Sequence, residues 1–192
     1  MAAVRAQIPV AQKAIIMDNA ATSPIPTSTI AAASQSMQRR AEEGEGFFWD
    51  ACERADGVRK DVADHLGAKA DGIAFMKSTG EGINHIARSL DYPSGCNVVT
   101  TSLEFASNLF PWTALRQQGV EVRVVEPDDK RLGITPDHIA KHIDDDTHLV
   151  TMSWVTFQTD WPDDLGEALQ VASGDVGVLA RPQRLGYLGF RK

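Results

Sequence analysis

Short apolar runs alternate with helical patterns along this chain, and this alternation limits the folds that it can adopt. The clearest runs span residues 97–101, 120–125 and 149–155, and helical spacing separates each run from the next. Strands buried in a parallel sheet appear as short continuous apolar runs, and parallel neighbours need a long crossover, usually a helix. The sequence therefore predicts an α/β fold with a mostly parallel sheet and flanking helices.

Other segments extend this series toward both ends of the chain. Apolar residues recur every three or four positions over 49–66 and mark one face of a helix, which Gly67 is expected to end. Thr27 and Ser28 are the expected caps of an earlier helix. The other predicted elements are helices over 29–43, 107–118, 136–143 and 163–172, a helix that includes 83–90, and strands over 72–76 and 176–180.

Composition narrows the functional classes. The 192 residues carry a net charge of −7, with a pI near 5.2, which disfavours a nucleic-acid surface because phosphate backbones need a basic face. No apolar run approaches the roughly 20 residues of a membrane span, and the segment 1–13 lacks the apolar region of a secretory signal. Cys52 and Cys96 are too few for a disulfide framework. We expect a cytoplasmic protein that binds neither nucleic acid nor membrane.

Ser78, Thr79 and Gly80 join a predicted strand to a predicted helix. Amides at a helix N-terminus are unpaired and favour an anion, the two hydroxyls could add donors, and glycine allows close approach to the backbone. These residues are therefore a candidate phosphate site. The alternative is an ordinary N-cap with Glu81 as its capping-box partner, which is favoured when this stretch is considered alone.

A second candidate follows the apolar run at 97–101, at the sheet edge where open α/β folds bind ligands. Phe105 could stack there on a flat ring. Phe110 and Trp112 could line a pocket or belong to the core, and core packing is favoured.

Two further patterns have ordinary structural explanations. Asp18 and Asn19 precede a proline turn and suit either an Asx turn or a loop that contacts substrate. His138 and His142 share one helix face and could chelate a metal, but no acidic residue completes a metal motif, and a solvated face is favoured.

Taken together, five stretches resemble the class V aminotransferase-like family of pyridoxal-phosphate enzymes, which includes the cysteine desulfurases and the isopenicillin-N-epimerase-like proteins. The stretches occur in the family's order and extend over about residues 15–170 without a large gap. They are Met17–Pro24, Ser78–Asn84, Glu104–Trp112, Gly119–Val125 and Thr147–Val155.

The resemblance implies the type I pyridoxal-phosphate fold, pyridoxal phosphate as cofactor, an amino-acid-like substrate, and a homodimer or a complementing subunit. Residues 27–192 would form an incomplete large domain after an N-terminal segment, 1–26. Phe105 would hold the ring-stacking position, which is His in the cysteine desulfurases and often Phe in the epimerase-like branch, so it points away from a cysteine desulfurase. The other implied contacts are Ser78, Thr79, Gly80, Thr156 and Gln183 for the cofactor and Asn19 and Ala20 for the substrate.

The sequence departs from the family where the chemistry is completed. The family's D-A-x-Q-x-L-G stretch aligns with 180–186, where Ala180 replaces the aspartate that keeps the pyridine nitrogen protonated. Asp160 replaces an expected glycine. None of the seven lysines follows a family-like histidine, so no lysine for a Schiff base is identified. Residues 171–192 are accordingly expected to be a degenerate or disordered tail.

Three hypotheses remain open. The chain could be the N-terminal part of a pyridoxal-phosphate lyase, epimerase or transaminase that is active only in a longer or complemented form. It could be a non-catalytic homologue that binds a phosphate-bearing ligand or a partner subunit. It could also be a truncated product whose last residues are foreign to the fold. An incomplete fold leaves apolar surface uncovered, so we expect self-association or dependence on a partner.

Overall fold

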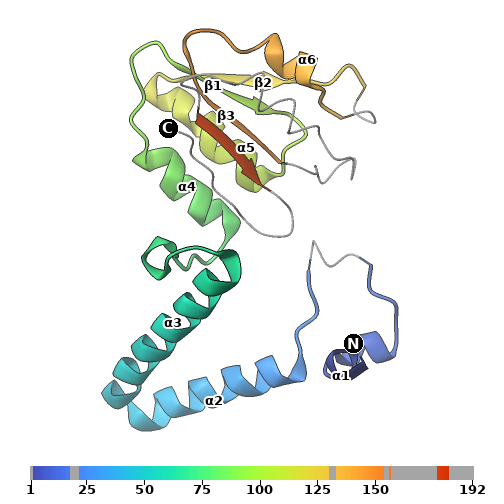
Figure 1. Ribbon diagram of the computed structural model, residues 1–192, viewed down its shortest axis with the longest axis vertical. Helices are drawn as coiled ribbons and strands as arrows, with labels where there is room; N and C mark the ends of the chain where they lie inside the picture. Colours follow the sequence, from blue (N-terminus) through green and yellow to red (C-terminus); the bar gives the residue numbers. More distant parts are fainter. Residues whose placement is uncertain (1, 18–21, 130–132, 154–155, 157–176, 182–192) are drawn as a thin grey trace. The chain divides into compact units, whose positions relative to one another are not determined.

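The computed structural model describes residues 2–17, 22–129, 133–153, 156 and 177–181. The chain divides after Phe75 into two compact units (Figure 1). None of the described helices combines the length and the apolar character that crossing a membrane requires.

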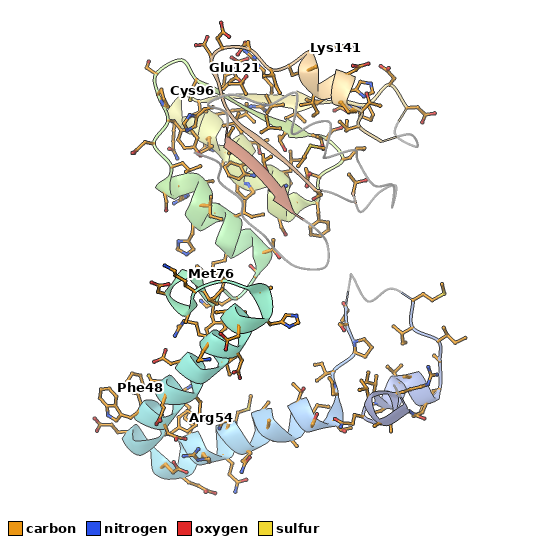
Figure 2. All side chains as sticks on the ribbon, in the orientation of Figure 1. Phe48, Arg54, Met76, Cys96, Glu121 and Lys141 are labelled. Carbon is orange, nitrogen blue, oxygen red and sulfur yellow. The ribbon has the colours of Figure 1, made fainter. Side chains whose placement is uncertain are left out.

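The first unit is helical. It contains α1 (Ala2–Ala6), the 3₁₀ turn η1 (Pro9–Gln12), α2 (Thr27–Glu43), α3 (Glu45–Leu66) and the 3₁₀ turn η2 (Ala70–Gly72). Gly44 separates α2 from α3 with a φ of 56°, which glycine adopts without a Cβ clash. Arg39 of α2 pairs with Asp50 of α3 at 2.5 Å. Phe48 projects from α3 and is largely exposed (Figure 2).

Two helix starts in this unit differ from those predicted. Thr27 and Ser28, expected as caps, instead bond to Gln7: the Thr27 amide donates to its carbonyl at 2.8 Å and the Ser28 hydroxyl to its side chain at 2.7 Å. The helix therefore begins at Thr27, and α3 begins at Glu45, ahead of the predicted residue 49. Gly67 ends α3 in the left-handed region, with φ 66°, as predicted.

The strand predicted over 72–76 is wrong. The carbonyl of Ile73 accepts a hydrogen bond from Nε of Arg59 at 3.1 Å rather than from a neighbouring strand. The Arg59 guanidinium carbon also lies 5.2 Å from the ring centre of Phe75, which remains half exposed. An apolar run forms a strand only where another strand pairs with it, and the run itself does not reveal whether one does.

The second unit is built on a four-stranded parallel sheet in the order β2-β1-β3-β4 (Figure 1). The predicted parallel sheet is therefore confirmed. Its strands are β1 (Asn97–Thr101), β2 (Glu121–Val125), β3 (Thr147–Ser153) and β4 (Gly177–Arg181). The helices of this unit are α4 (Thr79–Ser89) before β1, α5 (Ala106–Thr113) and the 3₁₀ turn η3 (Ala114–Gln118) between β1 and β2, and α6 (Pro136–Ala140) between β2 and β3.

Each face of the sheet has its own apolar core. Val98 belongs to one core and Val99 to the other, because successive residues of a strand point to opposite faces. Burial on both faces explains why these strands appear in the sequence as continuous apolar runs. The core on the α4 and α5 face contains Ile83, Ala87, Cys96, Val98, Trp112, Leu115, Val120, Val122 and Leu149. The core on the α6 face contains Val99, Leu103, Val125, Ile134, Ile139 and Val150.

Helix α5 is shorter than predicted. It ends at Thr113, and η3 continues to the predicted stop at Gly119, whose φ is 84°. Trp112 is fully buried in the core, as favoured, whereas Phe110 is exposed, so its placement in the core is wrong.

Helix α6 is also shorter than predicted: it ends at Ala140 instead of residue 143. The amide of Asp144 donates to Oγ1 of Thr147 at 2.9 Å, and not to the carbonyl that a continued helix would offer. At the other end of α6, Thr135 and Pro136 form the predicted cap.

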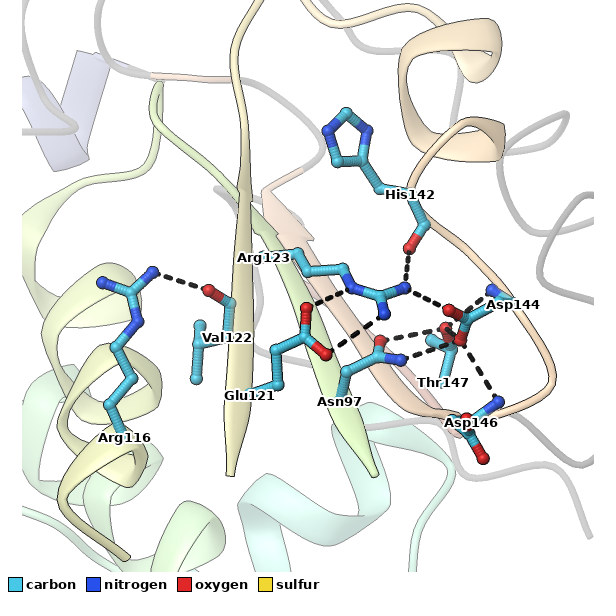
Figure 3. A network of polar contacts seen from close by, with 9 residues as sticks. All are labelled: Asn97, Arg116, Glu121, Val122, Arg123, His142, Asp144, Asp146 and Thr147. Carbon is cyan, nitrogen blue, oxygen red and sulfur yellow. Dashed lines mark hydrogen bonds and ion pairs between the residues drawn. The ribbon is translucent and has the colours of Figure 1, made fainter. Parts of the chain in front are cut away.

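A polar network joins the amino ends of three strands (Figure 3). Arg123 of β2 donates to Asp144 at 2.6 Å and to Glu121 at 2.8 Å. Asn97 of β1 donates to the other Asp144 oxygen at 2.8 Å, and Thr147 of β3 donates to Asn97 at 2.9 Å. Hydrogen bonding to Arg123 holds the pKa values of Asp144 and Glu121 below their ordinary values. The network lies at the sheet edge opposite the candidate ligand site.

Candidate functional site

The predicted phosphate and ring contacts lie where α4 and α5 begin. Both helices cover the same face of the sheet, and they pack against each other. The segment from Ser102 to Phe105 connects the carboxyl end of β1 to the start of α5. In an open α/β sheet, this edge is where ligands bind.

Ser78 is the N-cap of α4, which confirms the N-cap that the sequence favoured for this stretch. Its Oγ accepts a hydrogen bond from the Glu81 amide at 3.1 Å. The Glu81 carboxylate accepts from the amide of Lys77 at 2.6 Å, one residue before the position that a capping box uses. Within the described part of the chain, the amides of Thr79 and Gly80 form no hydrogen bond. The cap therefore leaves two amides of the helix N-terminus available for an anion.

The start of α4 lies directly against the start of α5. A Cβ built on Gly80 would lie 3.8 Å from both Cβ and Oγ of Ser107, which is ordinary van der Waals contact. Ser107 is the second residue of α5, and Phe105 stands at the N-cap of the same helix. The structure therefore brings the amides of Thr79 and Gly80 close to the segment that carries the aromatic ring.

Phe105 is 52% exposed, although Leu103 and Glu104 directly before it are buried. An exposed aromatic ring at the start of a helix and at the carboxyl edge of a sheet is positioned to stack on a planar ligand. Phe105 belongs to neither apolar core, whereas Leu103 and Trp112 from the same part of the chain are each buried in one of them.

The segment that carries Phe105 is fastened on both sides. Ser102 donates from its hydroxyl to Glu126, just beyond β2, at 2.5 Å. Glu104 is 4% exposed and accepts two hydrogen bonds from Ser153, the last residue of β3, one from the amide and one from the hydroxyl at 2.7 Å. The sequence showed neither bond, because the partners are separated by more than twenty positions.

Of the four other residues predicted to contact the cofactor or the substrate, the structure describes only Thr156. Thr156 lies three positions beyond β3 in the sequence and is buried, at 1% exposure. Asn19, Ala20 and Gln183 lie outside the described residues.

Asn108 is a buried residue whose importance the sequence did not reveal. Its Oδ1 accepts from Nε1 of Trp112 at 3.0 Å and from Oγ1 of Thr151 at 3.2 Å, so it joins α5 to β3. It is 2% exposed. The spacing from Asn108 to Trp112 is i, i+4 on one helix, and this is the signal that could have indicated their contact.

The described ionisable groups offer little alternative chemistry. Burial raises the pKa of the Cys96 thiol, which favours its neutral, unreactive form. His138 accepts from the Thr135 amide at 3.0 Å and so belongs to the cap of α6. Over the described ranges, no group of three or more His, Cys, Asp and Glu side chains is arranged to hold a metal ion.

Comparison with known proteins identifies the family. Residues 15–164 match the family described as aminotransferase class-V. A probable cysteine desulfurase of Methanothermobacter thermautotrophicus is 33% identical over 180 residues, which is 92% of this chain and 44% of that protein. The chain belongs to the class V aminotransferase family. A probable cysteine desulfurase of Pyrococcus abyssi is 37% identical over 134 residues, 66% of this chain and 33% of that protein. The chain thus spans less than half the length of these curated relatives.

Solved structures that are similar to this class V aminotransferase chain have the same fold. The apo cysteine desulfurase from Thermococcus onnurineus NA1 superposes with a TM-score of 0.74 at 26% identity, over 93% of this chain and 46% of that chain. A C-DES variant with glycine covalently linked to its PLP cofactor gives a TM-score of 0.80 at 18% identity, over 92% of this chain and 48% of that chain. The family resemblance and the fold class predicted from the sequence are confirmed.

Proposed function

We propose that this chain binds pyridoxal phosphate at the start of α4 and α5, as part of a class V aminotransferase-like protein that acts on an amino-acid-like substrate. The observation that carries this proposal is the close approach of Gly80 to Ser107, because a Cβ added to Gly80 would lie 3.8 Å from Ser107, two residues after Phe105. One site then offers donors for a phosphate and an aromatic face for a ring.

The residues present fit the phosphate. The two amides of Thr79 and Gly80 lie at the positive end of α4, where a dianion is stabilised. The Thr79 hydroxyl and the remaining proton of the Ser78 hydroxyl could donate to further phosphate oxygens. Glu81 turns its carboxylate toward the amide of Lys77, at 2.6 Å, so its charge has a partner outside the proposed phosphate position.

The residues around the ring have separate functions in this proposal. Bound pyridoxal phosphate supplies an electron sink for a carbanion at the α-carbon of an amino acid. Phe105 covers one face of the pyridine ring and excludes water from it. Thr156 and Gln183 contact the rest of the cofactor, and Asn19 and Ala20 contact the substrate.

The 192 residues alone are proposed to bind the cofactor without completing the family's reaction. No lysine in the chain follows a family-like histidine, and Ala180 stands at the position of the family's aspartate. The strand β4 places Ala180 in register with Met152 of β3. Lyase, epimerase or transaminase chemistry would then need a longer or complemented form, and cysteine is the first substrate to test because the relatives are named cysteine desulfurases.

Ala180 also favours a second candidate function. Without an acidic partner for the pyridine nitrogen, the cofactor is a weaker electron sink. A homologue that lacks this partner could use the same site to hold a phosphate-bearing ligand without catalysis. Binding of pyridoxal phosphate with no turnover in any complemented form would support this candidate.

Titration of the purified chain with pyridoxal phosphate, followed by its visible absorbance, tests the proposed site. Gly80→Asp is expected to weaken binding at least about tenfold, because the new carboxylate repels the phosphate. Gly57→Asp is the matched control, since an added Cβ there meets no atom within 4 Å and α3 is not part of the site. Equal affinities of the two variants would overturn the phosphate assignment.

Borohydride trapping followed by peptide mass spectrometry tests the proposed lack of activity. We expect no single lysine to be trapped and no sulfide to be released from cysteine by the chain alone. A trapped adduct at one specific lysine, or sulfide release above a heat-treated control, would contradict this part of the proposal.

A further inference from the structure

We propose that Glu104 is a positioning residue for the ring site: it fixes the Phe105 segment to the end of β3 and so holds the aromatic ring in its stacking position. This inference rests on the proposed function and deepens it. The phosphate contacts come from α4, whereas Glu104 acts on the other half of the site, the aromatic ring.

The burial of Glu104 shows that its position is determined. A carboxylate is rarely buried as deeply as Glu104, at 4% exposure, because removal of its charge from water is costly unless hydrogen bonds compensate. Both hydrogen bonds from Ser153 go to this carboxylate, one to each oxygen. Two bonds from one residue fix both the position and the orientation of the acceptor.

The chain geometry transmits this constraint to Phe105. Glu104 is the residue immediately before Phe105, and Phe105 has an extended backbone, with φ −66° and ψ 149°, at the N-cap of α5. An anchored side chain one residue away limits the directions in which an exposed ring can point. Phe105 itself is half exposed, so packing alone constrains its ring less than it constrains a core residue.

The second anchor of the same segment is weaker. Ser102 donates to Glu126 at 2.5 Å, but this hydrogen bond is exposed to solvent. A solvent-exposed contact contributes less than a buried one. Of these two anchors, the buried contact between Glu104 and Ser153 is therefore the stronger, and it lies next to Phe105 in the chain.

Two ligands separate positioning of the ring from a general structural effect. Pyridoxal phosphate uses both the ring and the phosphate contacts, whereas inorganic phosphate uses only the amides of α4. The affinities of the wild type, Glu104→Ala, Glu104→Gln and Phe105→Leu for both ligands are measured by calorimetry, after circular dichroism has established that each variant is folded. A double variant of Glu104→Ala with Phe105→Leu completes the set.

Glu104→Ala is expected to weaken pyridoxal phosphate binding about tenfold and to leave phosphate binding within about twofold. Glu104→Gln is expected to keep an affinity within about threefold of the wild type, because its amide can accept from the Ser153 amide and donate to the hydroxyl. The effects of Glu104→Ala and Phe105→Leu on pyridoxal phosphate should not add, since both act through the same ring.

Equal losses for both ligands would show that Glu104 is merely structural, and unchanged pyridoxal phosphate binding or additive effects would also overturn the inference. If Glu104→Ala does not fold, Ser153→Ala decides: it removes one of the two hydrogen bonds and should weaken pyridoxal phosphate about fivefold, with phosphate unaffected. No change in Ser153→Ala would overturn the inference. A wild type that binds neither ligand would overturn the proposed function together with it, whereas Phe105-dependent binding that ignores Glu104 overturns the inference alone.

Discussion

Replacement of Asn108 by alanine should destabilise the second unit strongly. The Asn108 Oδ1 atom accepts from the Trp112 indole at 3.0 Å and from the Thr151 hydroxyl at 3.2 Å, and all three residues are buried. Alanine leaves both donors without an acceptor. A buried donor that loses its partner costs roughly 1–3 kcal/mol. Two such donors and a small cavity together predict a loss of about 3 kcal/mol in the free energy of unfolding.

The companion variant Thr151→Val shows whether the loss comes from these hydrogen bonds. Valine keeps the shape of threonine but removes one donor, and alone it should cost about 1 kcal/mol. In the double variant with Asn108→Ala, the Thr151 hydroxyl no longer lacks a partner. The combined loss should therefore be smaller than the sum of the single losses by about 1 kcal/mol.

Urea unfolding and native-state hydrogen exchange measure these effects. Because the chain has two units, a single unfolding transition is not assumed, and exchange of the amides in β1 and β3 reports on the second unit directly. A loss of about 3 kcal/mol should lower their protection by about 100-fold. A loss below about 1 kcal/mol, or strictly additive single losses, would refute the assignment of Asn108 as the acceptor that joins α5 to β3.

Two further predictions concern the network at the amino edge and the end of η3. Arg123→Met should lower the melting temperature most above about pH 4. Hydrogen bonding to Arg123 lowers the pKa of Asp144 from its ordinary value of 3.8, so the ion pair stabilises the fold fully above that pH and its contribution is lost as the pH falls through the folded-state pKa. Melting curves from pH 3 to 7 test this, and a difference between variant and wild type that does not depend on pH would contradict it. Gly119→Ala should cost about 1 kcal/mol, because φ is 84° and no neighbouring atom lies within 4 Å of an added Cβ, so the cost is that of the backbone alone. Gly119→Asn should cost less in the same urea experiment, and equal losses would argue against a left-handed requirement.

A strand could be predicted from the sequence where an apolar run also finds neighbouring strands to pair with in the folded sheet. The apolar run at 97–101 became β1 with the predicted bounds, because strands on both sides pair with it. The similar run at 72–76 did not become a strand, because Arg59 takes the carbonyl of Ile73 and half of the Phe75 side chain remains in water. The two runs look alike in the sequence, and only the three-dimensional partner distinguishes them.

The phosphate half of the site was more visible in the sequence than the ring half. Ser78, Thr79 and Gly80 are adjacent in the chain, so the donors of a helix N-terminus can be recognised from a short stretch. Thr156 was identified by resemblance, and its burial is known only from the structure.

Phe105 could be identified from the sequence as a ring that follows a strand, but what holds it there could not. The segment before it is anchored by Ser153, which lies 49 positions after Glu104. Such contacts depend on the order of strands in the sheet, in which β1 lies between β2 and β3. A glutamate directly before an aromatic residue, just after an apolar run, is the local sign that the sequence offers. Burial itself, however, follows from the packed sheet, so the positioning of the ring is a property of the fold rather than of the motif.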